Sequence, residues 1–219
     1  MRLYRDLFRL ENIRRYSFEL TLIKEIIEIL VRYPYILKIE GHLGLREGAF
    51  LFRCASRISE NGVAVEIGSF KGRSTMFIAT GLKKIPGSKL FAIDTFEGSE
   101  MPDWARGDSK DIFSEFLKNT EKLKDVIVPI KGRSQDVVKN WDKEIDFLWI
   151  DGDHSYEGCY TDIINWVPFV KIGGIVAFHD YPNASGVNKA VNEIFKRKFE
   201  GSENGRVCLI YWAKKGNQK

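Results

Sequence analysis

The chain has 219 residues and a mass of 25.2 kDa, which suits one domain with a sizeable core and excludes two large ones. Hydrophobic residues make up 44% and charged residues 29%, so a mostly disordered or collagen-like chain is excluded. The net charge of +4 is a thin and scattered excess that does not indicate nucleic-acid binding. The three cysteines form no C-x-x-C pair and indicate free thiols rather than disulfides or a zinc site.

The N-terminus and the apolar stretches bear on where the protein works. The first residues, MRLYRDLFRLENIRRY, carry charges every few positions, unlike the apolar core of a secretory signal. No stretch reaches the ~20 consecutive apolar residues that a membrane span needs. The sequence therefore predicts a cytoplasmic protein without membrane association.

Residues 1–60 differ in pattern from the rest and predict a helical preface, or lid, ahead of the main domain, residues 61–219. Apolar residues recur at helical spacing from Leu20 to Leu30 and again from Phe50 to Ile58. Two roles stay open for this preface, because it can pack on a sheet edge or cover a site. It is also a candidate interface for a homo-oligomer.

From residue 62 onward, short apolar runs alternate with amphipathic stretches. The runs are rich in β-branched residues, which is typical of strands buried on both faces of a parallel sheet. The predicted strands are 62–68, 90–94, 126–130, 145–151, 174–179 and 206–213, with a weak seventh near residue 199. The predicted helices are 73–84, 110–123, 135–141, 156–169 and 187–198. This alternation predicts an α/β fold with a doubly wound, mostly parallel, Rossmann-like sheet of six to seven strands.

The first predicted strand ends in a glycine-containing turn, E-I-G-S-F-K-G-R-S, over residues 66–74. Gly68 lets the chain turn tightly and approach a ligand, and Gly72 lets the next helix begin close to the sheet. The N–H groups at that helix N-terminus attract an anion such as a carboxylate or a phosphate. The spacing G-x-x-x-G is neither the dinucleotide motif G-x-G-x-x-G nor a P-loop. A plain strand-to-helix turn is the alternative interpretation.

Asp94 ends the second predicted strand. A carboxylate at this position can accept hydrogen bonds from both hydroxyls of a ribose, the usual arrangement for nucleoside cofactors in this architecture. An aspartate that closes a strand also serves as a turn or cap residue. The glycine-containing turn that precedes it favours the ribose interpretation.

Carboxylates and histidines follow two later strands. Asp151 and His154 end the segment I-D-F-L-W-I-D-G-D-H, and His179 and Asp180 follow the next strand. Ligands of parallel sheets bind at the carboxyl ends of strands, so these four side chains are expected at one edge. Carboxylate oxygens with few nitrogens suit Mg²⁺ or Mn²⁺. Helix capping by the aspartates is the alternative, but it leaves His179 and Asp180 unexplained.

Together these motifs make the chain from about residue 44 to residue 212 resemble a class I S-adenosylmethionine-dependent methyltransferase. Within that class it is similar to the small metal-dependent O-methyltransferases, the catechol and macrolide-sugar enzymes. The resemblance implies methyl transfer from S-adenosylmethionine to a hydroxyl of a small molecule, phenol or sugar-like. It implies no nucleic-acid partner.

The resemblance also assigns residues. The implied cofactor site comprises Glu66, Gly68, Ser69, Gly72, Ser74, Asp94, Ser134, Gln135 and Asp151. In it, Asp94 is the ribose acid, and Ser134 and Gln135 of the segment G-R-S-Q-D are adenine contacts.

The segment W-I-D-G-D-H resembles the family's metal-and-base motif. The resemblance implies Asp151 as a metal ligand and His154, three residues on, as the general base. H-D at residues 179–180 stands where relatives carry D-N, E-D or D-D. Asp180 and His179 therefore complete the implied site for Mg²⁺ or Mn²⁺, although a histidine at 179 departs from the family's pattern.

Three other classes of protein compete with this interpretation. An NAD-dependent oxidoreductase shares the sheet and the ribose acid but requires a different glycine spacing. A nucleic-acid methyltransferase normally carries N/D-P-P-Y/F after its fourth strand to hold a flipped base, where this chain reads I-D-G-D-H. A non-catalytic protein that keeps the fold has little need for four ionisable side chains at one edge. The oxidoreductase and the non-catalytic protein are kept as alternatives.

Overall fold

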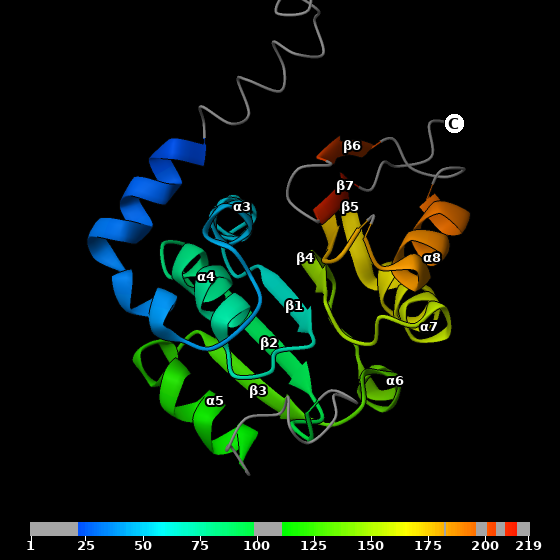
Figure 1. Cartoon of the computed structure of the whole chain (residues 1–219), viewed down its shortest axis with the longest axis horizontal. Coiled ribbons are helices and arrows are strands. Elements are labelled where there is room, and N and C mark those ends of the chain that lie inside the picture. Colours follow the sequence, from blue (N-terminus) through cyan, green and yellow to red (C-terminus); the bar gives the residue numbers. More distant parts are fainter. Residues whose placement is uncertain (1–21, 99–110, 182, 196–200, 205–208, 214–219) are drawn as a thin grey trace, which may run out of the picture.

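A computed structural model of the chain describes residues 22–98, 111–181, 183–195, 201–204 and 209–213. Within these residues a seven-stranded sheet runs in the order β3-β2-β1-β4-β5-β7-β6, with helices on both faces (Figure 1). The first five strands in that order pair in parallel, and β7 pairs antiparallel with both β5 and β6. The predicted doubly wound, mostly parallel α/β fold is confirmed.

The bounds of the elements are as follows. The strands are β1 (Val63–Ile67), β2 (Lys89–Asp94), β3 (Ile127–Lys131), β4 (Ile145–Ile150), β5 (Val170–Phe178), β6 (Gly201–Asn204) and β7 (Leu209–Ala213). The α-helices are α3 (Leu45–Ala55), α4 (Arg73–Leu82), α5 (Ile112–Thr120), α6 (Ser134–Val137), α7 (Tyr156–Trp166) and α8 (Ser185–Phe195). Short 3-10 helices are η1 (Pro34–Lys38), η3 (Glu121–Leu123), η4 (Val138–Asn140) and η5 (Val167–Phe169), and residues 22–32 form a further helix. No described helix is long and apolar enough to cross a membrane.

The helix predicted over residues 135–141 forms within one residue of its predicted bounds, but in two short pieces. It consists of α6, which is a single turn, and the 3-10 turn η4. The chain becomes extended at Trp141, whose ring packs edge-on against Phe91 and Trp166 at centroid distances of 5.0 and 5.2 Å. The helical stretch thus ends just before this ring, and the sequence pattern does not reveal the ring's packing.

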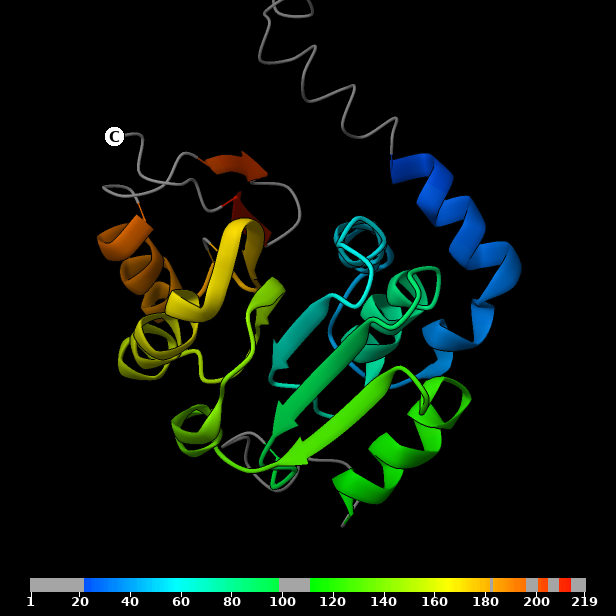
Figure 2. The same ribbon diagram turned by 180° about the vertical axis from the view of Figure 1, so that it is seen from behind.

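Alternation along the strands builds a core on each face of the sheet. In β4, Phe147 and Trp149 belong to the core shared with α3, α4 and α5, whereas Leu148 and Ile150 belong to the core under α7 and α8. The two views in Figures 1 and 2 show these helix groups on opposite faces. All four side chains are buried, which explains the uninterrupted apolar run in the sequence.

The described part of the N-terminal region shares the first of these cores. Leu22 and Ile29 of the helix 22–32, Ile36 of η1 and Phe50 of α3 lie in one buried cluster with Met76 of α4. This region therefore packs on the same face of the sheet as α4 rather than around a core of its own.

Two further contacts fix α3 in place. Gly81 lets α4 approach α3 closely, because a Cβ there would lie 2.5 Å from the carbonyl oxygen of Phe52. The buried guanidinium of Arg53 pairs with Glu25 of the helix 22–32 at 2.8 Å. Close packing and a buried ion pair thus hold α3 between the sheet's own helix and the N-terminal helix.

Candidate active site

The carboxyl ends of the parallel strands meet at one edge of the sheet, and the strand order reverses between β1 and β4. Backbone bonds place the residues that follow these strands side by side. The N–H of Asp151 donates to the Ile67 carbonyl at 2.8 Å, and the N–H of His179 donates to the Ile150 carbonyl at 3.1 Å. Ligands of open α/β sheets bind at such a reversal, so this edge is the candidate site.

The glycines of the turn after β1 are required by geometry. Gly68 has a φ of +87°, and a Cβ on it would lie 2.1 Å from the carbonyl oxygen of Asp151. Gly72 has a φ of +92°, and a Cβ there would lie 2.9 Å from Cγ2 of Thr120. Only glycine satisfies both the left-handed backbone and the close approach at these positions.

Buried polar atoms without partners lie at this turn. Glu66 is fully buried, and its Oε2 accepts a hydrogen bond from the Thr75 hydroxyl at 2.5 Å. Its Oε1 has no hydrogen-bond partner among the described residues, and neither has the hydroxyl of buried Ser69. Burial raises the pKa of Glu66 to about 7, although the nearby hydroxyls, that of Ser74 first, act to lower it. Unsatisfied buried acceptors and donors of this kind suit a polar ligand.

Asp94 holds the glycine-containing turn through its side chain. Its Oδ2 accepts the N–H groups of Ser69 and Phe70, each at 2.8 Å, and its Oδ1 accepts the N–H of Phe96 at 2.7 Å. A carboxylate offers about four acceptor positions, so these bonds leave one free. Asp94 is therefore a turn residue that also keeps one acceptor position for a ribose hydroxyl. To accept hydrogen bonds from both ribose hydroxyls, as predicted, one acceptor position would have to serve a backbone N–H and a hydroxyl together.

The predicted adenine contacts lie after β3. Gly132, the residue after β3, donates its N–H to the Asp94 carbonyl at 2.9 Å, which places this turn beside β2. The Ser134 hydroxyl donates to Oδ1 of Asp162 on α7 at 2.5 Å, whereas Gln135 is exposed. Burial raises the pKa of Asp162 to about 6. Asp162 lies inside an ordinary amphipathic helix pattern, so its sequence context gives no sign of the contact with Ser134.

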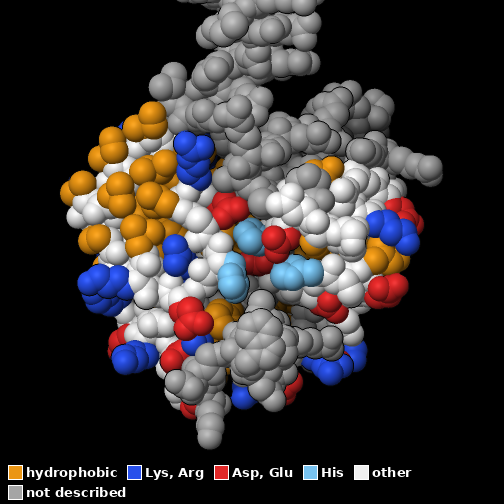
Figure 3. Space-filling view, viewed as in Figure 1, with side chains coloured by type: hydrophobic (Ala, Val, Ile, Leu, Met, Phe, Trp, Pro, Cys, Tyr) orange, Lys and Arg blue, Asp and Glu red, His pale blue; other side chains and the backbone are white. Residues whose placement is uncertain are grey.

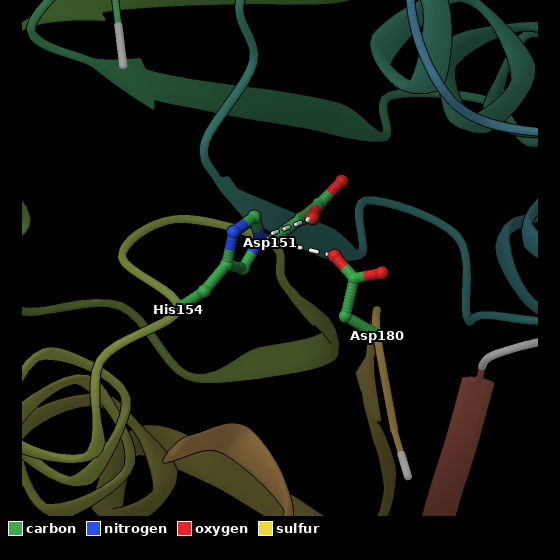
Figure 4. Close-up of side chains that lie close together, drawn as sticks. All are labelled: Asp151, His154 and Asp180. Atoms are coloured by element: carbon green, nitrogen blue, oxygen red, sulfur yellow. Dashed lines mark ion pairs between the residues drawn. The ribbon is translucent and has the colours of Figure 1, made fainter. Parts of the chain in front are cut away.

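Asp151, His154 and Asp180 point toward one another from the ends of β4 and β5 (Figure 4). Nε2 of His154 lies 3.1 Å from Oδ2 of Asp180 and 3.6 Å from Oδ1 of Asp151. One potential ligand atom from each residue lies within 4.8 Å of the others, a spacing that a metal ion can bridge. Figure 3 shows the histidine and acidic side chains grouped near the centre of this face. The predicted convergence of these three residues is therefore present.

Pairing sets the protonation of this cluster. Hydrogen bonds, first to Asp151 and then to Asp180, raise the pKa of His154 to about 10. Hydrogen bonds, first from His154 and then from His179, hold the pKa of Asp180 well below its usual range. His154 is thus protonated at neutral pH unless another cation takes its place beside the carboxylates.

His179 lies behind the carboxylates rather than among the three converging groups. Its side chain is only 8% exposed, and its Nδ1 lies 3.0 Å from Oδ2 of Asp180 and 3.3 Å from Oδ1 of Asp151. Its Nε2 faces Oε1 of Glu47, on α3, at 3.5 Å. Burial acts to lower the pKa of His179, but the three carboxylates outweigh it and raise that pKa well above its usual range.

The neighbouring carboxylate of Asp153 has a structural role. Asp153 accepts the N–H of Ser155 at 2.8 Å, and the Ser155 hydroxyl caps α7 by accepting the N–H of Gly158 at 3.0 Å. The capping alternative therefore accounts for Asp153. It does not account for Asp151 or Asp180, whose side chains meet His154.

Known proteins resemble this chain in both sequence and structure. A family described as "Methyltransferase domain" matches residues 65–181, more than half of the chain. The O-methyltransferase NovP has a TM-score of 0.65 at 20% identity over 79% of this chain and 81% of its own. The SAH-bound methyltransferase PaMTH1 of Podospora anserina has a TM-score of 0.62 at 12% identity over 95% of this chain and 97% of its own. CalS11, a TDP-rhamnose 3'-O-methyltransferase of calicheamicin biosynthesis, has a TM-score of 0.56 at 18% identity over 94% of this chain and 95% of its own.

The matched family spans every element that carries the candidate site except α3. It begins inside β1, before the glycine-containing turn, and ends at Tyr181, just past Asp180. The solved structures share the fold across most of their own length. The chain therefore belongs to the methyltransferase-domain family, and its recognition as a class I S-adenosylmethionine-dependent methyltransferase is confirmed.

Proposed function

We propose that this enzyme transfers a methyl group from S-adenosylmethionine to a hydroxyl of a small molecule, phenol or sugar-like, with the help of a divalent cation. The observation that carries the proposal is the arrangement at the strand-order reversal. Unpartnered buried polar atoms surround the turn after β1, and a cluster of aspartates and a histidine stands beside them after β4 and β5. The fold shared with NovP and CalS11, an O-methyltransferase and a sugar O-methyltransferase, supports this acceptor chemistry.

The cofactor would lie over β1, β2 and β3. The unpartnered oxygen of Glu66 and the hydroxyl of Ser69 offer an acceptor and a donor at the turn. Gly68 begins this turn after β1, Gly72 caps α4, and Ser74 stands in the first turn of that helix. Asp94 keeps one acceptor position for a ribose hydroxyl. Ser134 and Gln135 would contact the adenine, and the backbone of Asp151 adjoins Gly68 on the other side.

The donor set after β4 and β5 fits a divalent cation. Asp151 and Asp180 supply carboxylate oxygens within reach of one ion, and His154 stands beside them. Carboxylate oxygens suit Mg²⁺, and a neighbouring histidine also admits Mn²⁺. We assign Asp151 and Asp180 as ligands and place His179 behind them, because its Nδ1 already contacts both carboxylates.

His154 is our candidate general base. S-adenosylmethionine supplies the methyl group, and a bound divalent cation supplies a Lewis acid that lowers the pKa of the acceptor hydroxyl. The same positive charge between Asp151 and Asp180 would replace the proton that these carboxylates now stabilise on His154. The half-exposed imidazole, 52% accessible, would then accept the hydroxyl proton as the oxygen attacks the methyl carbon and the carbon–sulfur bond breaks.

Transfer of a labelled methyl group tests this function directly. The purified enzyme is incubated with labelled S-adenosylmethionine and a panel of phenols, nucleotide sugars and amines, with Mn²⁺, Mg²⁺ or excess chelator. We expect label on a hydroxyl acceptor only when a metal is present. Label on amines alone, or undiminished transfer in chelator, would refute the acceptor class or the metal, respectively.

A further inference from the structure

Helix α3 contributes a buried carboxylate to the site from outside the matched family region. Glu47 stands in the first turn of α3 and is 8% exposed. Its Oε2 accepts the N–H of Gly44 at 2.6 Å, as in a capping box. Its Oε1 faces Nε2 of His179 at 3.5 Å. The carboxylate that begins α3 thus also contacts the imidazole behind the proposed metal ligands.

The His179 ring is held between carboxylates on its two sides. Nδ1 contacts Asp151 and Asp180, and the ring lies edge-on to Trp149 at a centroid distance of 5.8 Å. Nε2 is buried without a hydrogen-bond partner among the described residues. The polar contact made by Nε2 is therefore the ion pair with Glu47. Rotation of the ring would carry Nδ1 away from the two aspartates.

We infer that Glu47 is a positioning residue of the metal centre, an inference that rests on the proposed metal site. By pairing with Nε2, Glu47 keeps Nδ1 of His179 directed at Oδ1 of Asp151 and Oδ2 of Asp180, which would hold both carboxylates in the orientation in which they face His154 and the proposed cation. Groups that orient metal ligands in this way typically contribute about 10–100-fold to metal affinity.

Replacing Glu47 by glutamine removes a negative charge near the site and also the anchor of the His179 ring. Each of these losses weakens the binding of a cation.

The test is a double-mutant cycle on Mn²⁺ binding, with free Mn²⁺ measured by electron paramagnetic resonance. Wild type, Glu47→Gln, His179→Gln and the double variant are compared. Glu47→Gln should weaken Mn²⁺ binding about 10-fold or more in the wild-type background. The same change should have an effect of less than about threefold when His179 is already replaced, because a residue acting through another shows non-additive coupling. The affinity for S-adenosylhomocysteine (SAH), the demethylated cofactor, should stay the same in all four proteins.

Two further variants separate positioning from charge and from stability. Glu47→Asp keeps the charge at the helix N-terminus but withdraws it from His179 by one methylene, so Mn²⁺ binding should weaken as it does in Glu47→Gln. Arg53→Met breaks the α3 ion pair with Glu25 without touching the site. It should lower the melting temperature and leave Mn²⁺ affinity unchanged.

The outcomes are distinguishable. Wild-type enzyme that binds no Mn²⁺ refutes the proposed metal site, and the positioning role with it. Wild-type Mn²⁺ affinity in Glu47→Gln overturns the positioning role alone. An equal loss in both backgrounds shows that Glu47 acts by charge and not through His179, which also overturns it.

Discussion

At the residue scale, His154 has two candidate roles, as general base or as metal ligand. As a general base, His154 is needed for proton transfer but not for holding the metal. His154→Ala should then lower kcat by about 100-fold or more, the usual contribution of a positioned base. Mn²⁺ and SAH affinities should stay within about threefold of wild type, as measured by spin resonance and calorimetry.

The competing role for His154 makes the opposite prediction for the metal. Its imidazole offers a nitrogen that could bind a metal ion together with oxygens of Asp151 and Asp180. A loss of Mn²⁺ affinity of about 10-fold or more in His154→Ala would identify it as a ligand and leave the base unassigned.

Glu66 gives the cofactor site a pH dependence. A cofactor that presents an ammonium group to its free oxygen would bind the ionised carboxylate, and the pKa of this buried group is raised to about 7. SAH affinity should therefore increase between about pH 6 and pH 7.5 as the carboxyl loses its proton. Calorimetric titrations of Glu66→Gln should show weaker binding without that increase. A slope retained in the variant would assign the titration to another group.

Asp162 affects stability with the opposite dependence from a salt-bridged aspartate. Its pKa rises from the ordinary value of 3.8 to about 6 in the fold, so the folded state holds the proton more tightly. Its contribution is fully present below about pH 4 and is lost as the pH rises to about 6. Asp162→Asn should thus gain about 1–3 kcal/mol over wild type between these pH values, by urea unfolding. A constant difference across that range would contradict the raised pKa.

The sequence revealed those site residues that stand next to one another in the chain. Asp151 with His154, His179 with Asp180, and the glycine-containing turn form compact motifs whose place at strand ends follows from the alternation of elements. Glu47 and Asp162 could not be found this way. Each looks like a helix residue locally, and its role comes from a contact with a distant part of the chain, with His179 and Ser134 respectively.

At the scale of elements, the crossing of α3 and α4 depends on glycine. Gly81→Ala would place a Cβ 2.5 Å from the Phe52 carbonyl and 2.9 Å from the Cβ of Ala55. Alanine favours the helix by about 1 kcal/mol, but forcing the helices apart costs about 1–3 kcal/mol or more. We expect net destabilisation in urea unfolding.

A matched control is Gly132→Ala, whose Cβ would meet its nearest neighbour at an ordinary 3.5 Å. This variant should change the free energy of unfolding by less than about 0.5 kcal/mol, as surface substitutions usually do. Stabilisation by Gly81→Ala would mean that the crossing has room to relax.

Most elements were predictable because strands buried on both faces read as apolar runs, and α4, α5 and α7 carry clear helical spacing. The helical stretch of α6 and η4 matches its predicted bounds to one residue at each end, whereas β5 begins at Val170, earlier than the predicted residue 174. What no local pattern encodes is the contact of Trp141 with Phe91 and Trp166.

At the scale of the whole molecule, the preface and the sheet share one core. The sequence places a boundary near residue 60, yet Ile29, Ile36 and Phe50 pack with Met76. A chain that begins at residue 61 would expose this apolar surface to water, which costs about 25 cal/mol per Å². We expect such a truncated protein to lack cooperative thermal unfolding by circular dichroism. A cooperative transition in it would show that the preface is an independent unit.

This shared core also limits how new specificities can arise. Exchanging the N-terminal region between related enzymes would replace at once the side chains that share a core with Met76 of α4 and the residue that faces His179. A foreign N-terminal region chosen for its acceptor preference would therefore first have to pack correctly against the core of this protein. Engineering of this enzyme should therefore proceed by single substitutions around α3 within the existing framework, where folding and chemistry can be optimised together.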